Sequence, residues 1–253
     1  AYNLPVFRGS PHVDDNQLRR EGVVRIYDLF VSEKETLIKQ DEMIQDFGKK
    51  CRLKGKFSSA DLNYALGQYV LQTAPCPDKS FVAQAAKMEV PIFLDSLANH
   101  SLGMNSAKLY LNGKNFDPSP SLDVLECAAL QYAAGNNGFF LLGGGGPKNF
   151  IQQGGPTLSQ IFGIKHEGAD RGIQITTANE KDGGLSGCTF HEAVTWGKYG
   201  KAGPDLVQIW GEASIIAPLV WGYAWNRSRR PLKKLREKKK EAYTSLLEKI
   251  KSN

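Results

Sequence analysis

The stretch that decides the fold is Gly138-Phe139-Phe140-Leu141-Leu142, followed at once by Gly143-Gly144-Gly145-Gly146-Pro147-Lys148-Asn149. A short apolar run bounded by glycines predicts a buried strand. The glycines after it let a ligand approach the backbone closely, and Pro147 suits the first turn of a helix. The run therefore predicts either a binding loop that can hold an anion at a helix N-terminus or a tight structural turn.

The same alternation of short apolar strands and helices extends to both sides of this stretch. It predicts a parallel sheet with helices on both faces, an α/β fold of Rossmann-like type. Ligands of such sheets bind at the carboxyl ends of the strands, so the predicted site consists of the segments 95–104, 143–149, 177–186 and 211–214. The expected strands are 90–94, 138–142, 173–177 and 206–210, and the expected helices are about 120–134, 147–163, 189–199 and one that opens near 214.

The first ninety residues give weaker signals. Residues 1–22 are polar and are expected to be irregular, and an apolar segment follows at 23–31. Ser32 and Glu35 have the spacing of a capping box, which predicts a helix over 33–47. A basic connector at 49–57 leads to a second helix that begins at Ser58 and Asp61, and a short helix is expected at 80–89.

Composition narrows the class of protein. With 253 residues, 41% of them hydrophobic and 23% charged, the chain has an ordinary globular composition. The longest apolar-biased stretch, 213–225, contains Ser214 and Pro218 and is shorter than the roughly 20 residues of a membrane span, so the chain is not expected to be transmembrane. It begins with Ala1 rather than Met, which indicates a processed, trimmed or fragmentary product.

Cysteines and histidines give no metal signature. The four cysteines form no Cys-x-x-Cys pair and the four histidines form no cluster. We therefore expect free thiols in a reducing, soluble compartment, either cytoplasmic or organellar, and no metal.

Positive charge is concentrated at the C-terminus. Residues 226–253 hold eleven Lys or Arg and three Glu, a net charge of +8, so residues 1–225 carry −2 of the overall +6. Near-helical spacing of apolar residues predicts an amphipathic helix in this tail. Two interpretations stay open: a solvated terminal helix, or an arm that docks on an acidic protein, RNA or anionic lipid. The apolar residues are Leu232, Leu235, Tyr243, Leu246, Leu247 and Ile250.

Residues 191–198, His-Glu-Ala-Val-Thr-Trp-Gly-Lys, are the most informative stretch for chemistry. A lysine beside a tryptophan in a dry pocket can have a lowered pKa and act as an imine-forming nucleophile. Glu192 could bind a cationic amine, with Trp196 supplying a cation–π contact. The alternative is an exposed Lys198 on an amphipathic helix, and on these residues alone that alternative is favoured.

Three segments in this order make the chain resemble deoxyhypusine synthase. They are the Gly143–Asn149 loop, the stretch from Gly168-Ala169-Asp170 through Thr177-Ala178 and Asp182-Gly183 to Ser186-Gly187, and Glu192-Ala193-Val194-Thr195-Trp196-Gly197-Lys198. The last signature overturns the exposed-lysine interpretation. The sequences of residues 147–153 and 183–187 resemble the prokaryotic-type branch more than the animal enzymes.

The resemblance implies a chemistry and a set of site residues. The family uses NAD to oxidise spermidine, holds the resulting butylimine on an enzyme lysine, and passes it to a hypusine-carrying translation factor. Carried over by position, Lys198 would be the catalytic lysine. The substrate-binding residues would be Glu192, Trp196, Asn149 and Gly183, and the NAD-binding residues would be Asn99, Gly144, Thr177, Ala178, Glu212 and Ala213.

Several positions depart from the family pattern. Leu185 and Asn149 replace a spermidine-contacting aspartate and a histidine, Asn99 and Glu212 replace NAD-contacting aspartates, and Met104 stands where animal enzymes have an aspartate. An amide in place of a carboxylate removes a charged acceptor for a ribose hydroxyl.

The resemblance also implies a domain organisation. Residues 1–225 would form the C-terminal two thirds of the family fold, lacking its first nucleotide-binding portion, and residues 226–253 a basic helical tail. A homo- or hetero-oligomer is expected. The first hypothesis is an aminobutyl transferase completed by a second chain or a further segment. The alternatives are a catalytically degenerate structural subunit, or a synthase that transfers the group to a small amine to give homospermidine-like products.

Overall fold

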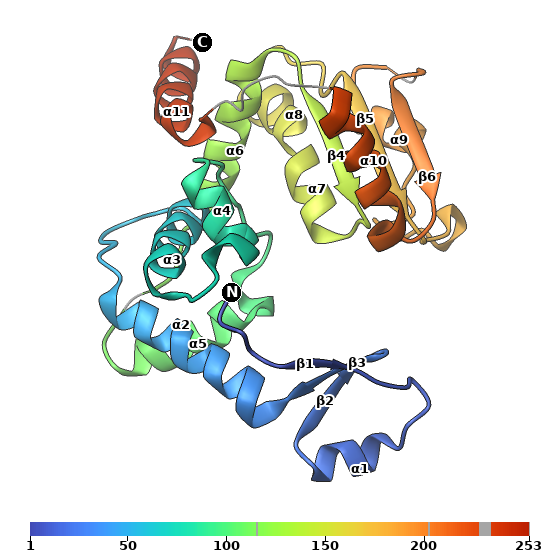
Figure 1. Ribbon diagram of the computed structural model, residues 1–253. Helices are drawn as coiled ribbons and strands as arrows, with labels where there is room; N and C mark the ends of the chain where they lie inside the picture. Colours follow the sequence, from blue (N-terminus) through green and yellow to red (C-terminus); the bar gives the residue numbers. More distant parts are fainter. Residues whose placement is uncertain (115, 202, 228–233, 253) are drawn as a thin grey trace. The chain divides into compact units, whose positions relative to one another are not determined.

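The computed structural model describes residues 1–114, 116–201, 203–227 and 234–252 (Figure 1). Contacts divide the chain into two compact units. Unit 1 consists of residues 1–92 and 96–119, and unit 2 of residues 93–95 and 120–253. The division into a domain of residues 1–225 and a tail of residues 226–253 stays a prediction.

Unit 1 contains a small antiparallel sheet. Its strands β1 (Val6–Arg8), β2 (Val23–Ile26) and β3 (Leu29–Ser32) lie in the order β1-β3-β2. The expectation that residues 1–22 are irregular is wrong for β1 and for helix α1 (Asp15–Arg20). The local sequence pattern does not reveal β1, because this short strand forms by pairing with β3, more than twenty residues further along the chain. Val6 lies opposite Val31 in this pair.

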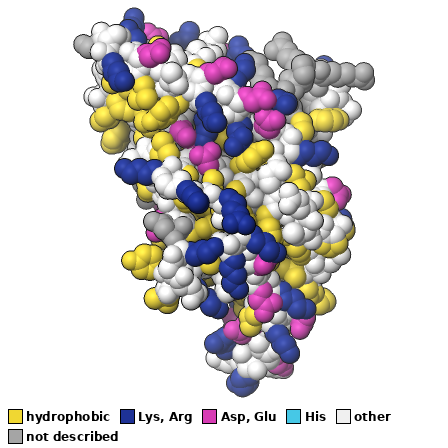
Figure 2. Space-filling view, turned by 90° about the vertical axis from the view of Figure 1, so that its left-hand side faces the viewer, with side chains coloured by type: hydrophobic (Ala, Val, Ile, Leu, Met, Phe, Trp, Pro, Cys, Tyr) yellow, Lys and Arg dark blue, Asp and Glu magenta, His cyan; other side chains and the backbone are white. Residues whose placement is uncertain are grey.

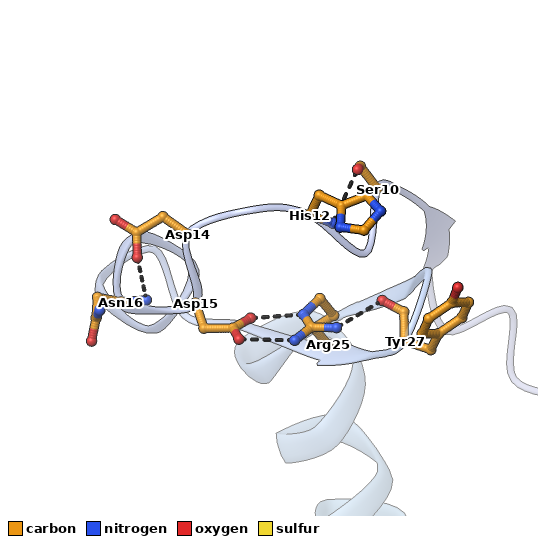
Figure 3. A network of polar contacts seen from close by, with 7 residues as sticks. All are labelled: Ser10, His12, Asp14, Asp15, Asn16, Arg25 and Tyr27. Atoms are coloured by element: carbon orange, nitrogen blue, oxygen red, sulfur yellow. Dashed lines mark hydrogen bonds and ion pairs between the residues drawn. The ribbon is translucent and has the colours of Figure 1, made fainter.

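Helix α1 is tied to this sheet by polar contacts (Figure 3). Asp14 caps the helix by accepting from the Asn16 amide at 2.8 Å. The Arg25 guanidinium on β2 donates to both carboxylate oxygens of Asp15, at 2.7 and 2.8 Å, and to the Tyr27 carbonyl at 3.2 Å. The hydrogen bond from Arg25 lowers the pKa of Asp15. The fork of the guanidinium thus fixes one helix turn on the edge strand β2.

The helices of unit 1 enclose its hydrophobic core. The predicted helix 33–47 is confirmed in outline: it begins as a π-helical turn, η1 (Glu33–Ile38), and continues as α2 (Lys39–Lys50), with Ser32 as N-cap. The predicted start of the second helix at Ser58 and Asp61 is confirmed: α3 (Ser59–Thr73) begins there, and these two residues form a capping box. The other elements are η2 (Pro77–Lys79), α4 (Phe81–Lys87), η3 (Leu97–Asn99) and α5 (Ser101–Leu111), and the core comprises Phe47, Phe57, Leu62, Leu66, Val70, Ala83, Leu109 and Phe116.

The strand predicted at 90–94 is wrong, since these residues have no regular secondary structure. Pro91 has no amide to give to a ladder. The Val90 amide donates to the Ala85 carbonyl at the end of α4, and the Ile92 carbonyl accepts from the Asn63 side chain at 2.9 Å. Because these backbone groups already have hydrogen-bond partners in neighbouring helices, they are not available to pair with a strand.

Unit 2 is built on a parallel sheet of β4 (Gly138–Leu142), β5 (Arg171–Thr176) and β6 (Leu206–Trp210), in the order β4-β5-β6. The register places Leu141 opposite Gln174, and Gln174 opposite Gln208. The predicted α/β class is confirmed for these three strands, while Rossmann-like topology stays a prediction.

The two faces of this sheet differ. On one face Leu141 packs in a core cluster with Phe190 and Ala193 of α9 (Phe190–Thr195), and with Tyr199. On the other face lies α10 (Ala213–Arg227), whose Trp221 ring sits 5.8 Å from that of Phe140 (Figure 1). This second face is only partly covered. Large apolar side chains are exposed in β4, in β6 and along α10. They are Phe140, Leu142, Val207, Trp210, Ile215, Leu219, Trp221, Tyr223 and Trp225.

Helix α6 (Pro120–Ala134) packs against the C-terminal helix α11 (Leu235–Lys251), which confirms the predicted amphipathic helix of the tail. Ala242 and Leu246 are buried, and the Lys239 ammonium lies 2.6 Å from the Glu126 carboxylate, with both side chains at most 10% exposed. Leu232 lies outside the described residues. Helix α11 is therefore part of the core of unit 2, and docking of the tail on another molecule stays a prediction.

Two further observations concern the chain as described. All four cysteines are free thiols. Among the described helices, none combines the length and hydropathy that a membrane crossing needs.

Candidate active site

Three post-strand segments meet at the carboxyl edge of the parallel sheet. The Gly143 amide donates to the Ile175 carbonyl at 2.8 Å, and the Gly211 amide donates to the Thr176 carbonyl at 2.9 Å. These bonds extend the ladder beyond the strands and bring the segments 143–149, 177–186 and 211–214 to one edge. The fourth predicted segment, 95–104, is wrong as a post-strand loop, because no strand precedes it; from Ser96 onward it belongs to unit 1.

The glycine run serves loop packing. A Cβ added to Gly144 would lie 2.4 Å from the Ser186 Cα, so only glycine allows these two loops to touch. Helix α7 (Gly146–Gln152) then begins after Gly145, which has φ of +72°, and is followed by α8 (Gly154–Pro156) and the π-helical turn η4 (Thr157–Ile161), close to the predicted helix 147–163. The run therefore sets the position of Lys148 and Asn149 on the first turns of α7.

A buried polar network lies beneath these loops. Gln174, fully buried on β5, donates to the carbonyls of Gly143 and Ser186 at 2.8 and 3.0 Å. Its side-chain oxygen accepts from the Lys148 ammonium at 3.0 Å. Lys148 also donates to the carbonyls of Leu185 and Cys188, at 3.1 and 2.7 Å, so each of its three N–H groups has an acceptor. One amine and one amide thus hold the loops that follow β4 and β5 together.

Replacing Lys148 with Met should loosen this network. The carbonyls of Leu185 and Cys188 and the Gln174 oxygen would lose their donor in a buried place, at a cost of about 1–3 kcal/mol in the free energy of unfolding. Chemical denaturation measures the effect. Lys165→Met, at an exposed position, is the matched control and should change the free energy by less than about 0.5 kcal/mol. Equal stability of the two variants would contradict the structural role of Lys148.

Lys198 is positioned by its backbone as well as by its side chain. Helix α9 ends at Thr195, short of the predicted end at 199, and Gly197 with φ of +67° turns the chain. The Lys198 carbonyl then accepts from the Ala169 amide at 2.9 Å. A Cβ on Gly168 would lie 2.6 Å from the Lys198 carbonyl carbon, so a glycine is required beside it.

The side chain of Lys198 reaches back to α7. It is 7% exposed, and its Nζ donates to Asn149 Oδ1 at 2.7 Å, its single acceptor among the residues that the structure describes. Burial lowers the pKa of Lys198, while nearby Cys188 and Glu192 act in the opposite direction. Burial also lowers the pKa of Lys148, and the charge of Lys198 lowers it further. Two amines close together in a dry place cannot both easily carry a proton.

The two buried lysines differ in their hydrogen bonds. Lys148 has three acceptors, which suits an ammonium ion. Lys198 has one, which leaves room for a neutral amine with a free electron pair. On these grounds Lys198 is the better nucleophile, although burial lowers the pKa of both.

The other predicted substrate residues are open to solvent. Trp196 follows the last residue of α9 and is 61% exposed. Glu192 is exposed on the first turn of the same helix, and its backbone amide donates to the Thr189 hydroxyl. Gly183 follows η5 (Glu180–Asp182) in a left-handed conformation, with open space beside it. Among these residues, Asn149 is the one that is hydrogen-bonded to Lys198. The Trp196 side chain is mostly open to solvent.

The predicted cofactor residues divide between the two units. Gly144, Thr177, Ala178, Glu212 and Ala213 lie at the carboxyl edge of the sheet, whereas Asn99 is an exposed residue of η3 in unit 1. Glu212 accepts from both the amide and the hydroxyl of Ser214, which lowers the pKa of its carboxyl.

The chemistry of these groups indicates which part of a dinucleotide could lie where. The N-terminus of α10 carries its own carboxylate, so it does not suit a pyrophosphate. A carboxylate retains further lone pairs that can accept ribose hydroxyls, and small residues at 177–178 leave the backbone accessible. The edge therefore fits the sugar portion of a dinucleotide at Glu212.

Sequence reasoning missed Gln174 and Cys188. A glutamine between two isoleucines in a buried strand is a signal that was available, because a buried amide needs partners. The sequence gives no such signal for Cys188, because its link to the site is its contact with Lys148 and its proximity to Lys198 in the fold. Among the described residues no group of three potential metal-ligating side chains comes together.

Comparison with known proteins identifies the family of this chain. The family described as deoxyhypusine synthase matches residues 1–224. The chain belongs to the deoxyhypusine synthase family. It is 36% identical over 253 residues to a deoxyhypusine synthase-like protein of Nostoc punctiforme, covering 96% of this chain and 64% of that one. It is 35% identical to a probable deoxyhypusine synthase 2 of Methanosarcina mazei, covering 89% of this chain and 64% of that protein.

A more distant deoxyhypusine synthase-like protein, from Caulobacter vibrioides, is 30% identical, with 91% of this chain and 64% of that one covered. The chain thus spans a little less than two thirds of the length of the curated relatives it matches. These matches establish the family of the chain.

Proposed function

We propose that this chain carries the nucleophilic lysine of a deoxyhypusine synthase-like transferase, which moves the aminobutyl group of spermidine through an imine on Lys198. The observation that carries the proposal is the Lys198 amine itself. It is buried, its pKa is lowered by that burial, and Asn149 holds it at 2.7 Å. A lowered pKa increases the fraction of neutral amine, and a neutral amine can attack an imine carbon, whereas an ammonium cannot.

In the proposed step the neutral Lys198 nitrogen forms a bond to the carbon of a protonated imine derived from spermidine. One proton passes from the Lys198 nitrogen to the diaminopropane nitrogen, the bond from the carbon to that nitrogen breaks, and neutral diaminopropane leaves a protonated imine on Lys198. The aminobutyl group is then held as an imine on Lys198. An acceptor amine attacks the same carbon in turn, and Lys198 leaves as a neutral amine.

The neighbouring residues would orient and bind. Asn149 accepts one N–H of Lys198 and so directs the electron pair of the amine. Glu192 would attract the cationic end of the polyamine, and Trp196 would contact its apolar methylene groups. Because Trp196 is 61% exposed in this chain, a second protein surface would have to cover it to exclude water from the reaction, which is a reason to propose an oligomer.

NAD, when bound, would supply the hydride acceptor that turns the amine into an imine and the hydride donor that later reduces it. Glu212 would accept hydrogen bonds from ribose hydroxyls, and Gly144, Thr177, Ala178 and Ala213 would lie along the same edge. Asn99 is proposed as a further contact. The acceptor would be either a hypusine-carrying translation factor or a small amine, the latter giving homospermidine-type products.

One observation favours a second candidate, a catalytically inactive structural subunit. The Lys198 amine is almost fully enclosed and already hydrogen-bonded, so its present arrangement also satisfies a purely structural role.

Reduction with borohydride distinguishes the two candidates. The protein, expressed at its natural length and in its native assembly, is incubated with NAD and spermidine, reduced, digested and examined by mass spectrometry. An aminobutyl adduct on Lys198 is expected. Absence of any adduct from the intact assembly would favour the structural subunit, and free homospermidine in the reaction would identify a small-amine acceptor.

Replacing Asn149 with Asp should slow adduct formation by changing the pKa of Lys198. A carboxylate 2.7 Å from the amine favours the ammonium form and so raises the Lys198 pKa. At neutral pH each unit of increase lowers the neutral fraction about tenfold. The rate of adduct formation, measured as a function of pH, should therefore rise at higher pH in the variant than in the unmodified protein.

Asn136→Asp, an exposed position in the loop before β4, is the matched control and should leave the pH profile in place. Lys148, Cys188 and Glu192 also act on this cluster, and both variants retain them. A profile that does not move in Asn149→Asp would exclude Asn149 as a partner of the reacting amine.

A further inference from the structure

The segment between α2 and α3 concentrates positive charge in a way that the proposed transferase does not use. Residues 49–57 contain five Lys or Arg and no Asp or Glu. Lys114, after the end of α5, donates to the Lys49 carbonyl at 2.7 Å and adds a sixth cation. We name this set the basic strip: Lys49, Lys50, Arg52, Lys54, Lys56 and Lys114 are all exposed.

The strip has a regular construction. Cys51, Leu53 and Phe57 pack against the core of unit 1, while Arg52 and Lys54 alternate with them and face solvent. In extended backbone the residues of one parity share a side and recur about every 6.6 Å. Gly55, with φ of +71°, bends the segment before Lys56. The apolar residues therefore anchor a row of cations to a folded surface.

Most of this charge has no opposite charge paired with it in the described part of the chain. Lys50 pairs with Asp46 at 2.7 Å. Among the residues that the structure describes, Arg52, Lys54 and Lys56 have no ion pair. A hollow beside the row has a mixed lining, which comprises Lys50, Arg52, Gln68, Gln72 and Thr73 together with Phe47, Cys51, Ala65 and Tyr69. Figure 2 shows the face on which this segment lies, and Lys and Arg side chains gather across its middle.

From this surface we infer that the basic strip binds the phosphate backbone of a single nucleic acid strand without reading its sequence. Lysine is depleted from protein–protein interfaces, which are built around apolar centres, and the apolar residues of the strip face inward. Nucleic acid interfaces are instead strongly positive and gain affinity from neutralised phosphates. A single strand can follow the bend at Gly55, whereas a duplex is stiff over a far longer length.

Fluorescence anisotropy with a labelled oligouridine, over a series of KCl concentrations, tests the inference on the full-length protein. The logarithm of affinity should fall linearly with the logarithm of salt, with a slope of about −0.7 for each phosphate contacted. The variant R52E/K54E/K56E should bind at least about tenfold more weakly, and its slope should be smaller by about 2.

The matched control is K34E/K79E/K87E, which changes the net charge equally at three exposed positions of unit 1 outside the strip. It should retain the affinity of the unmodified protein within about twofold, and circular dichroism should show both variants folded. Equal weakening in the two variants would show that net charge alone governs binding, and would overturn the inference. Binding of polyglutamate without binding of oligouridine would assign the strip to an acidic protein and overturn it as well.

Discussion

Replacement of Lys198 with Arg is expected to abolish the aminobutyl adduct and to lower any transfer activity on the order of 1,000-fold or more. A guanidinium stays protonated at any pH that the protein survives, so it has no electron pair for an imine carbon. Mass spectrometry after borohydride reduction measures the adduct, and release of diaminopropane measures the first transfer independently.

Because Lys198 is buried, a larger side chain could disturb the fold instead of the chemistry. Lys198→Met keeps the length of the side chain without its charge and should give the same loss while removing the cost of a buried amine. Lys165→Arg, at an exposed position, is the control and should retain the adduct on Lys198. Adduct at normal yield in both Lys198 variants, on another residue, would refute the assignment of Lys198.

Replacement of Lys239 with Met is expected to destabilise unit 2 by about 3–5 kcal/mol. The Lys239 ammonium lies 2.6 Å from Glu126, and the two side chains are 5% and 10% exposed. Removing one partner leaves a buried carboxylate without a counter-charge, which is the costly case for an ion pair. Hydrogen exchange resolved by peptide should show faster exchange in α6 and α11 together.

A double variant separates the pair from its surroundings. Glu126→Leu combined with Lys239→Met replaces both charges by apolar groups, and its stability should return to within about 1 kcal/mol of the unmodified protein. Lys238→Met, at the exposed neighbouring position, should have little effect. If Lys239→Met were as benign as Lys238→Met, α11 would not be held by this pair.

The strands of the parallel sheet could be predicted because their signal is local. Residues 138–142 and 206–210 form β4 and β6 with the predicted bounds, and 173–177 is displaced by one or two residues. Each is a short apolar run bounded by turn residues, which is sufficient for a buried strand. Residues 90–94 are also a short apolar run, but they are not a strand. Pro91 was a visible argument against one, whereas the hydrogen bonds that Ile92 accepts from Asn63 and Val90 donates to Ala85 could not be read from the sequence.

The residues of the candidate site come from the resemblance and remain a prediction, and their geometry could not be predicted from local pattern. Lys198 followed from the resemblance, but the end of α9 at Thr195 and the turn at Gly197 depend on left-handed backbone. The contact between Lys198 and Asn149 joins residues 49 positions apart. The network of Lys148 and Gln174 likewise joins different elements, and only the packed sheet shows that the loops after β4 and β5 share one buried amine.

All four indole rings of the chain belong to unit 2, at Trp196, Trp210, Trp221 and Trp225, and each is more than half exposed. Intrinsic emission excited at the indole band would therefore follow unit 2 alone and leave unit 1 spectroscopically silent. Since the rings already meet water in this chain, their emission maximum should shift little when it unfolds. Binding of another molecule over α10 or the end of α9 should instead shift the tryptophan emission maximum to shorter wavelength and protect the rings from acrylamide quenching.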